Sequence, residues 1–249
     1  EVVRLASFYM KNDRVSVKME SDEASKPKIL QSFIRVQESG KAKQLLDLLT
    51  VENPDSCIIF CNTQEAVNGL YTFLSKAGLP IDKMHGGMVQ DDRTAVMEDF
   101  RKGRLRYLVA TDVAARGIDV DNVTHVVNYD VPEEKESFIH RTGRTGRAGK
   151  TGVALTLVTP SEERSWQGVK DFAQQEITEI DPPSARFVQH HKAAFEKKLQ
   201  ERPVIKRARN RELNKDITKV CFNGGRKEKL RAIDFVGTLT NIPGIDADD

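Results

Sequence analysis

Apolar and polar positions follow two different patterns along the middle of the chain. Short continuous apolar runs, such as Cys57-Ile58-Ile59-Phe60, are separated by longer stretches in which apolar residues recur at helical spacing. Runs of this kind are typical of strands that are buried on both faces of a parallel sheet. The regular alternation of such strands and helices predicts an α/β sandwich with a mostly parallel sheet.

The same pattern predicts the position of each element. Strands are expected at residues 31–36, 57–60, 81–84, 106–110, 124–128 and 153–158. Helices are expected at residues 41–49, 64–77, 90–102, 133–147 and 161–175. Ligands of such sheets gather at the carboxyl ends of the strands, so the polar residues that follow each strand are the first candidates for a site.

Composition narrows the class of protein only slightly. The chain has 249 residues and a formal net charge of +2, so its overall charge does not by itself indicate a nucleic-acid-binding protein. The three cysteines, Cys57, Cys61 and Cys221, form neither a disulfide framework nor a metal pattern, and this fits a reducing cytoplasm. No apolar run reaches the roughly 20 residues that a membrane span requires, so no membrane association is expected.

Changes in composition predict four segments. Residues 1–27 read as a helix, a short strand and a polar linker, and the chain begins without Met, which suggests a fragment. Residues 28–182 form the α/β domain. Residues 183–215 form a basic linker, and residues 216–249 begin a further small domain of alternating strand and helix.

The basic segment is a candidate nucleic-acid contact. Between residues 186 and 215 there are ten Lys or Arg residues and three Glu residues. Such an excess of positive charge can neutralise a nucleic-acid backbone and would give salt-dependent binding. The plainer interpretation is a solvated linker without a specific contact.

The most distinctive stretch is residues 140–149, His-Arg-Thr-Gly-Arg-Thr-Gly-Arg-Ala-Gly. In a helix, His140, Arg144 and Arg147 would share one stripe. Each glycine would cost that helix roughly 1 kcal/mol relative to Ala. Guanidinium groups beside glycine backbone suit a polyphosphate, because Arg stays charged and presents a planar fork to phosphate oxygens. A solvated basic helix is the alternative.

This stretch resembles the sixth motif of the DEAD-box RNA helicases, and further motifs of that family occur upstream in the expected order. The resemblance covers roughly residues 1–185 and implies a RecA-like three-layer sandwich. It implies that residues 1–27 are the end of a first RecA-like domain and its linker, and that residues 28–182 are the second RecA-like domain. It assigns Arg144 and Arg147 to the γ-phosphate of ATP, as catalytic arginine fingers. It also implies that His140 and Arg141 organise the interface with a first RecA-like domain.

Three more motifs carry implied RNA contacts. Thr63 follows the strand at residues 57–60 and resembles the fourth motif, although an ordinary helix N-cap explains it as well. Gly86, Gly87, Gln90 and Arg93 resemble a second phosphate-contacting loop, and a structural turn is the alternative.

The stretch from residue 109 to residue 119 resembles the fifth motif. The resemblance assigns Thr111, Arg116 and Gly117 to RNA and Asp119 to the ribose hydroxyls of ATP. Considered without the resemblance, Asp112 and Asp119 are possible helix caps.

The chain itself contains no Gly-x-x-x-x-Gly-Lys-Ser/Thr phosphate loop and no Asp-Glu-Ala-Asp sequence. The resemblance implies ATP with Mg²⁺ as cofactors. Because these two motifs are missing here, the Mg²⁺ ligands are expected on a first domain outside this chain. By itself the chain is expected to be inactive as an ATPase. A non-catalytic RNA-binding or annealing module is the alternative function, and a DNA helicase of the same superfamily is a third.

The C-terminal segment supplies the last expectation. Residues 217–222 alternate like a strand, and residues 232–239 read as an amphipathic helix. This order could begin an RRM-like sheet, truncated here. The amino-acid sequence of this segment resembles the C-terminal domain of ribosome-assembly helicases of the DbpA type. This resemblance implies large-subunit ribosomal RNA as a partner in the cytoplasm.

Overall fold

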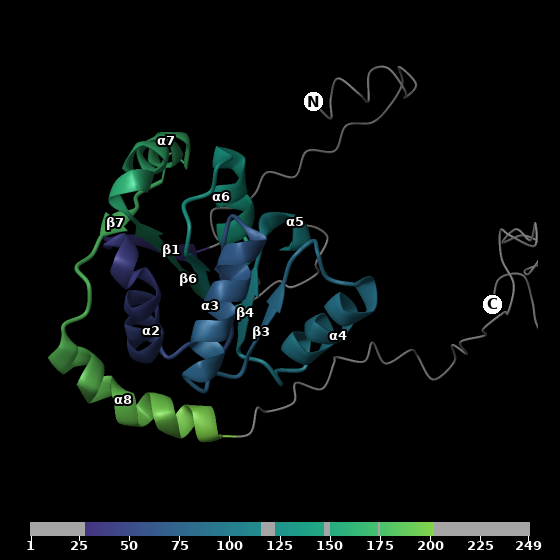
Figure 1. The fold of residues 1–249 in the computed structure, drawn as a ribbon. Helices are drawn as coiled ribbons and strands as arrows, with labels where there is room; N and C mark the ends of the chain where they lie inside the picture. Colours follow the sequence, from purple (N-terminus) through teal and green to yellow (C-terminus); the bar gives the residue numbers. More distant parts are fainter. Residues whose placement is uncertain (1–27, 116–122, 147–149, 174, 202–249) are drawn as a thin grey trace, which may run out of the picture. The chain divides into compact units, whose positions relative to one another are not determined.

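A computed structural model describes residues 28–115, 123–146, 150–173 and 175–201. The described segments form one α/β domain in which strands and helices alternate (Figure 1). The strands are β1 (Lys28–Arg35), β2 (Cys57–Phe60), β3 (Ile81–Met84), β4 (Tyr107–Ala110), β5 (His125–Asn128), β6 (Thr151–Val158) and β7 (Thr178–Glu179). The helices are α2 (Lys41–Glu52), α3 (Gln64–Lys76), α4 (Gln90–Arg101), α5 (Asp112–Ala115), α6 (Lys135–Thr142), α7 (Glu163–Ala173) and α8 (Ala185–Gln200), with short 3₁₀ turns at Glu38–Gly40 and Pro160–Glu162.

The seven strands form one sheet in the order β3-β4-β2-β5-β6-β1-β7, and every pair is parallel. The four-residue strands β2 to β5 are in register, so that Phe60 lies opposite both Ala110 and Asn128, and Met84 lies opposite Ala110. The expected mostly parallel α/β sandwich is confirmed.

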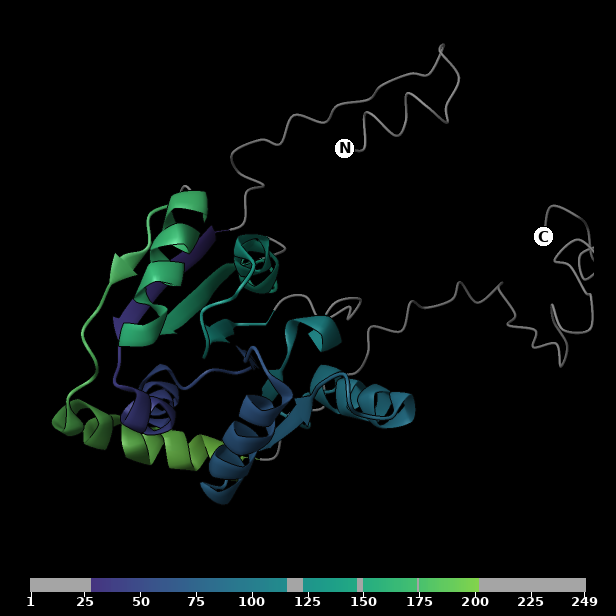
Figure 2. The same cartoon turned by 45° about the horizontal axis from the view of Figure 1, so that its top comes forward.

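Helices cover both faces of the sheet, because successive strand residues point to opposite sides. Ile59 packs with α2, α3 and α8, whereas Ile58 and Phe60 pack with α4 on the other face. The second face continues over β1 and β6, which α6 and α7 cover (Figure 2). Trp166 of α7 is buried there. Side chains of Phe33 and Phe138 contact the indole ring, with centroid distances of 5.2 and 5.7 Å.

Buried cysteines belong to this core. Cys57 and Cys61 are both 0% exposed, and burial raises the pKa of each thiol well above its usual range. They act as small apolar residues, as predicted.

The segment expected to be a basic linker starts with a helix. Residues 185–200 form α8, which begins at the N-cap Ser184 and packs against α2 (Figure 1). Phe195 on its inner face is buried in the same core as α2 and α3. The apolar spacing of α8 accounts for this correction, since Val188, His191 and Phe195 fall on one stripe facing the domain. Residues 202–249, with the rest of the basic run and the RRM-like segment, lie outside the described residues, as do residues 1–27.

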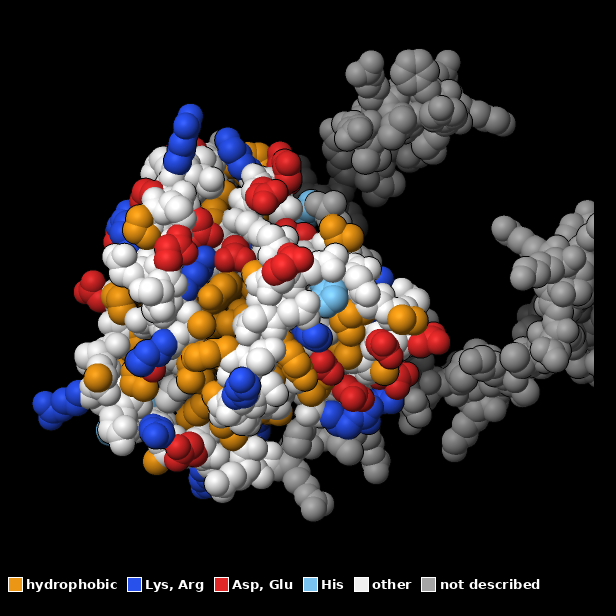
Figure 3. Space-filling model, viewed as in Figure 1, with side chains coloured by type: hydrophobic (Ala, Val, Ile, Leu, Met, Phe, Trp, Pro, Cys, Tyr) orange, Lys and Arg blue, Asp and Glu red, His pale blue; other side chains and the backbone are white. Residues whose placement is uncertain are grey.

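No helix within the described ranges is long and apolar enough to cross a bilayer. Apolar side chains show between the helices in the space-filling view, and acidic side chains lie both near α6 and α7 and around α4 (Figure 3).

Candidate functional site: the carboxyl edge of the sheet

The predicted RNA-contacting residues follow three neighbouring strands. The register places Cys61, His85 and Thr111 directly after the ends of β2, β3 and β4. Because β4 lies between β3 and β2, the Gly86-Gly87 loop, Thr111 and Thr63 come from adjacent strand ends at one edge of the sheet. This is the edge at which parallel sheets bind their ligands.

Thr63 is an N-cap. Its backbone is extended, and its Oγ1 accepts a hydrogen bond of 3.1 Å from the amide of Ala66 in the first turn of α3. The side chain is exposed, and the cap uses the oxygen only as an acceptor. The hydroxyl hydrogen therefore stays available to a phosphate oxygen beside the helix N-terminus, so the two interpretations of Thr63 are compatible.

The Gly86-Gly87 loop is exposed, and short-range hydrogen bonds to His85 hold its shape. The amide of Gly87 donates to Nδ1 of His85 over 3.2 Å, and the amide of Met88 donates to the carbonyl of His85 over 3.1 Å. A Cβ on Gly87 would lie 2.7 Å from Oε1 of Gln64, whereas one on Gly86 would meet only an ordinary contact. Among the described residues, the atoms nearest to that Cβ therefore belong to the side chains of Gln64 and His85 and not to another backbone segment.

Gln90 and Arg93 pair with each other on the first turn of α4. Nη1 of Arg93 donates to Oε1 of Gln90 over 3.1 Å, and Nη2 reaches the carbonyl of Ala114 over 3.4 Å. Arg93 thus connects α4 to α5, while Gln90 is exposed at the same edge of the sheet.

Arg141 lies at the centre of the strand ends. Its side chain is 1% exposed and donates to both carboxylate oxygens of Asp112, each over 2.7 Å. It also donates to the carbonyl of Asp130 and to Oδ1 of Asn62, each over 2.8 Å, and lies over the ring of Phe60. The side chain is therefore held within this domain, and the role of Arg141 in organising an interface with a first RecA-like domain stays a prediction, in which it would act by positioning its neighbours.

Lys41 forms a second buried cluster of charges beside the one around Arg141 and Asp112. Lys41 is 5% exposed and donates to Asp130 over 2.9 Å and to Glu162 over 3.0 Å. Burial opposes the charge of Lys41, but the two carboxylates outweigh it and hold the pKa of the ammonium group above its ordinary value. Asp130 in turn accepts from the amide of Asn62 over 3.0 Å. Lys41 is thus linked through Asp130 to both Asn62 and Arg141.

The arginine-glycine stretch is not one continuous helix, and the predicted helix at residues 133–147 is shorter in the structure. Helix α6 ends at Thr142, followed by Gly143 as its C-cap. Thr145 then leaves the helix and donates to the carbonyls of Val123 and Thr124 over 2.5 and 3.1 Å, in a β-bridge with Val123. Gly146 has a φ of +71°.

The predicted stripe of His140, Arg144 and Arg147 is therefore wrong as helical geometry, because Thr145 gains strand-type pairing that a helix would not allow. His140 is exposed in the last turn of α6, and Arg144 is partly exposed just after it. Arg147, Arg116, Gly117 and Asp119 lie outside the described residues.

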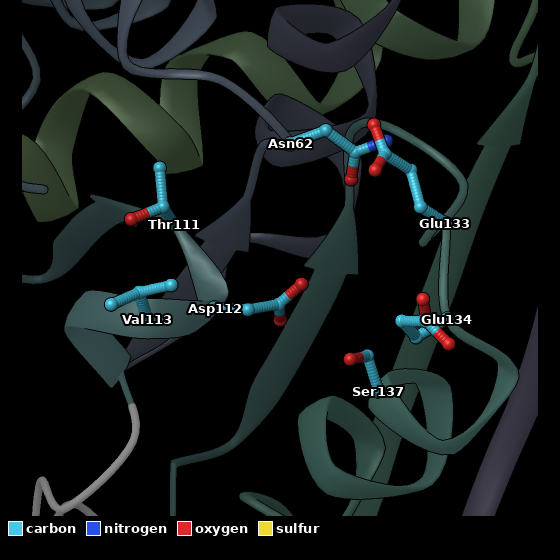
Figure 4. Close-up of a pocket in the computed structure, with 7 residues that line it drawn as sticks. All are labelled: Asn62, Thr111, Asp112, Val113, Glu133, Glu134 and Ser137. Atoms are coloured by element: carbon cyan, nitrogen blue, oxygen red, sulfur yellow. The ribbon is translucent and has the colours of Figure 1, made fainter. Parts of the chain in front are cut away.

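A pocket opens between α5 and α6 at this edge. Its volume is about 210 Å³, and its walls carry acidic and hydroxyl side chains (Figure 4). The lining residues are Asn62, Thr111, Asp112, Val113, Glu133, Glu134 and Ser137. Thr111, which is among these lining residues, is only 7% exposed.

Sequence reasoning missed Lys41, Asn62 and Asp130 as members of the site. Asn62 and Asp130 each follow a strand end by two residues, and this spacing was a usable signal. Lys41 had none, because its partners are distant in sequence. Among the described residues, no group of three or more His, Cys, Asp or Glu side chains is placed to hold a metal ion.

A parallel sheet with polar loops at its carboxyl edge, together with the arginine-glycine stretch, defines a RecA-like domain of the helicase type. A family model described as "Helicase conserved C-terminal domain" matches residues 40–149. The ATP-dependent RNA helicase DbpA of Bacillus subtilis (strain 168) is 49% identical over 249 residues, which are 100% of this chain and 52% of that protein.

Two further relatives support the same assignment. The DEAD-box ATP-dependent RNA helicase CshA of Geobacillus kaustophilus (strain HTA426) is 40% identical over 181 residues, which are 73% of this chain and 38% of that protein. A crystal structure of the E. coli DEAD-box protein SrmB bound to the regulator RraA matches with a TM-score of 0.60 and 34% identity, covering 65% of this chain and 95% of the matched chain.

The chain belongs to the DEAD-box RNA helicase family and contains the helicase C-terminal domain. It spans about half the length, or less, of the two curated relatives it matches.

Proposed function

We propose that this chain is the second RecA-like part of an ATP-dependent RNA helicase, in which ATP and RNA bind across two RecA-like domains and draw them together. The observation that carries the proposal is the row of Thr63, Gly86-Gly87 and Thr111 on three adjacent strand ends. In the DEAD-box family, the corresponding motifs contact the RNA backbone.

The RNA side relies on backbone contacts. The exposed Thr63 hydroxyl retains a free hydrogen for a phosphate oxygen, and the exposed Gly86-Gly87 loop leaves its backbone accessible. Gln90 and Arg93 at the start of α4, together with Arg116 and Gly117, complete this surface in the proposal. Contacts to the RNA backbone carry no base information, so this edge would bind RNA without reading its sequence.

The ATP side relies on arginine. Arg144 and Arg147 would stabilise the negative charge that develops on the γ-phosphoryl oxygens, an effect worth about 10³ to 10⁵ in rate. Asp119 would accept hydrogen bonds from the ribose hydroxyls, and His140 would contact the first domain. The phosphate-binding loop and the carboxylates for Mg²⁺ would come from that first domain, so the 249-residue chain alone is expected not to hydrolyse ATP.

The test is RNA-stimulated phosphate release by the full-length protein. Arg144→Ala and Arg147→Ala should each lower hydrolysis at least a thousandfold with little change in ATP affinity. Arg104→Ala is the matched control, because Arg104 pairs with Asp99 on the exposed side of α4. Wild-type hydrolysis in both finger variants would contradict the proposal and favour a non-catalytic RNA-binding or annealing module.

A finer proposal concerns the RNA. The match to DbpA takes in the whole chain, whereas the match to CshA takes in 181 residues, so the C-terminal part is shared with DbpA. We propose that this part, including the RRM-like segment and the basic run, directs the enzyme to large-subunit ribosomal RNA in the cytoplasm. Full-length protein should bind a ribosomal hairpin more tightly than an unrelated hairpin of equal length, and equal affinities would remove this assignment.

A further inference from the structure

Lys41 is distant in sequence from the proposed RNA contacts, yet it lies at the same edge of the sheet. It is the first residue of α2, it is 5% exposed, and its Nζ lies 4.8 Å from the centre of the Tyr129 ring. The proposed contacts with RNA and ATP do not use it. Burying an ammonium group is costly unless other groups compensate its charge, so the surroundings of Lys41 indicate what it does.

Five hydrogen bonds form a closed ring through Lys41. Its ammonium group donates to Asp130 over 2.9 Å and to Glu162 over 3.0 Å. The second carboxylate oxygen of Asp130 accepts from the backbone amide of Asn62 over 3.0 Å. The second carboxylate oxygen of Glu162 accepts from the amide of Val131 over 2.9 Å. The side-chain amide of Asn62 completes the ring by donating to the carbonyl of Val131 over 2.8 Å.

The ring joins the segments that follow β1, β2, β5 and β6 at the carboxyl edge. Within it, Lys41 supplies the positive charge between the carboxylates of Asp130 and Glu162, which are both largely buried. Without that charge, two like charges would lie close together and repel each other. Asp130 would then shift away from the amide of Asn62, so the position of Asn62 depends on Lys41.

Asn62 connects the ring to Thr63. Oδ1 of Asn62 accepts from Arg141 over 2.8 Å, so both ends of its side chain and its backbone amide are all engaged. Asn62 lies in the loop after β2, on the wall of the pocket that also carries Asp112 (Figure 4). The next residue, Thr63, is the N-cap of α3 and is exposed at this edge. Fixing Asn62 therefore fixes where the Thr63 hydroxyl lies.

We propose that Lys41 is a positioning residue for RNA binding. It holds the Thr63 hydroxyl where a phosphate of the RNA backbone would accept from it, and it acts through Asp130 and Asn62. This inference rests on the proposed function, which assigns Thr63 to RNA. A contact that is held in place beforehand loses less conformational freedom on binding, so the ring raises the affinity for RNA although Lys41 is buried away from it.

The first test measures amide hydrogen exchange in the 249-residue chain and involves no RNA. Lys41→Met should accelerate exchange at the amides of Asn62 and Val131, which belong to the ring. The amide of Cys61 donates to the carbonyl of Ala110 at the end of β4 and serves as the internal reference, which should change less. Equal acceleration at all three amides would show that Lys41 only stabilises the fold, and that result, or no acceleration at all, would overturn the proposal.

The second test measures RNA affinity of the full-length protein at a temperature at which every variant is folded. Lys41→Met should weaken RNA binding about tenfold, because small displacements of a contact are costly. ATP affinity and the rate of hydrolysis at saturating RNA should stay near wild type, whereas a loss of folded protein would lower that rate at every RNA concentration. Lys43→Met is the matched control, since Lys43 is exposed on the same helix and pairs with Asp47. Wild-type RNA affinity in Lys41→Met would contradict the proposal.

A double-mutant cycle with Thr63→Ala tests the route of the effect. Because Lys41 acts through Thr63, Lys41→Met should weaken RNA binding less than about twofold once the hydroxyl is absent. A full tenfold loss in that background would overturn the positioning role and leave the helicase proposal intact. If Thr63→Ala by itself leaves RNA affinity unchanged, the proposed RNA contact of Thr63 fails, and this inference fails with it.

Discussion

Arg141 and Asp112 form a bidentate ion pair in which Nε and Nη2 each lie 2.7 Å from a carboxylate oxygen. Arg141 lies in the last turn of α6, the helix that follows β5, and Asp112 begins the short helix that follows β4. The pair therefore ties together two loops that the proposed function assigns to different ligands. Its burial makes it both an anchor of the fold and a positioning element of the site.

Arg141→Ala should be strongly destabilising. The change leaves Asp112, Asn62 Oδ1 and the carbonyl of Asp130 without their donor. Breaking a buried pair typically costs about 3 to 5 kcal/mol, and the partial exposure of Asp112 argues for the lower end of that range. Urea unfolding of the 249-residue chain measures it. Arg104→Ala removes an exposed pair and should cost less than about 1 kcal/mol; similar losses in the two variants would show that Arg141 is no anchor.

Lys41→Met should destabilise the chain in a pH-dependent way. The folded state raises the pKa of Lys41 above its ordinary value of 10.5, so the ion pairs contribute fully below that pH. Their contribution is lost as the pH rises through the folded pKa. The difference in unfolding free energy between wild type and variant should therefore be constant from pH 7 to 9 and shrink above about 10.5. A difference that grows at high pH would contradict this assignment.

Two substitutions of Thr63 distinguish its capping role from its proposed contact with RNA. Thr63→Ala should lose about 1 kcal/mol of stability, because the amide of Ala66 loses its acceptor. Thr63→Asp should retain stability, since Asp is a good N-cap, but should weaken RNA binding at least tenfold by placing a carboxylate where a phosphate is proposed. Unfolding curves and RNA titrations are the measurements. Unchanged RNA affinity in Thr63→Asp would leave Thr63 as a cap alone.

Gly146→Ala should cost more than about 1 kcal/mol. Gly146 has a φ of +71°, and an added Cβ would lie 2.6 Å from Cγ1 of Ile29 and 3.2 Å from the carbonyl of Lys28. Gly69→Ala is the contrasting substitution, because Gly69 is helical with nothing within 4 Å of the added atom. It should stabilise the chain by about 0.5 to 1 kcal/mol. Thermal unfolding checks both predictions: the melting temperature should fall for Gly146→Ala and rise for Gly69→Ala.

Hydrophobic periodicity was enough to predict the class of fold and the order of its elements. The predicted strands at residues 57–60 and 81–84 coincide with β2 and β3 in the structure. The first is a continuous apolar run between polar loops, and in the second the buried Ile81 and Met84 enclose the polar Asp82 and Lys83. Helix ends were less well determined. Helix α6 stops five residues before Arg147, where the predicted helix was expected to end, because the β-bridge between Thr145 and Val123 outweighs local helix propensity.

The partners of the buried polar residues became known only from the three-dimensional fold. From the sequence, Arg141 looks like one more arginine of a phosphate-binding stretch. In the structure, the order of the strands places it against Asp112, Asn62 and Asp130, where it is buried from solvent. Lys41 is separated from Asp130 and Glu162 by 89 and 121 residues, so no local pattern could connect them. The pocket that carries Ser137 likewise arises where α5 and α6 meet. Periodicity reports which face of an element is buried, whereas contacts between distant side chains depend on how the strands are ordered in the sheet.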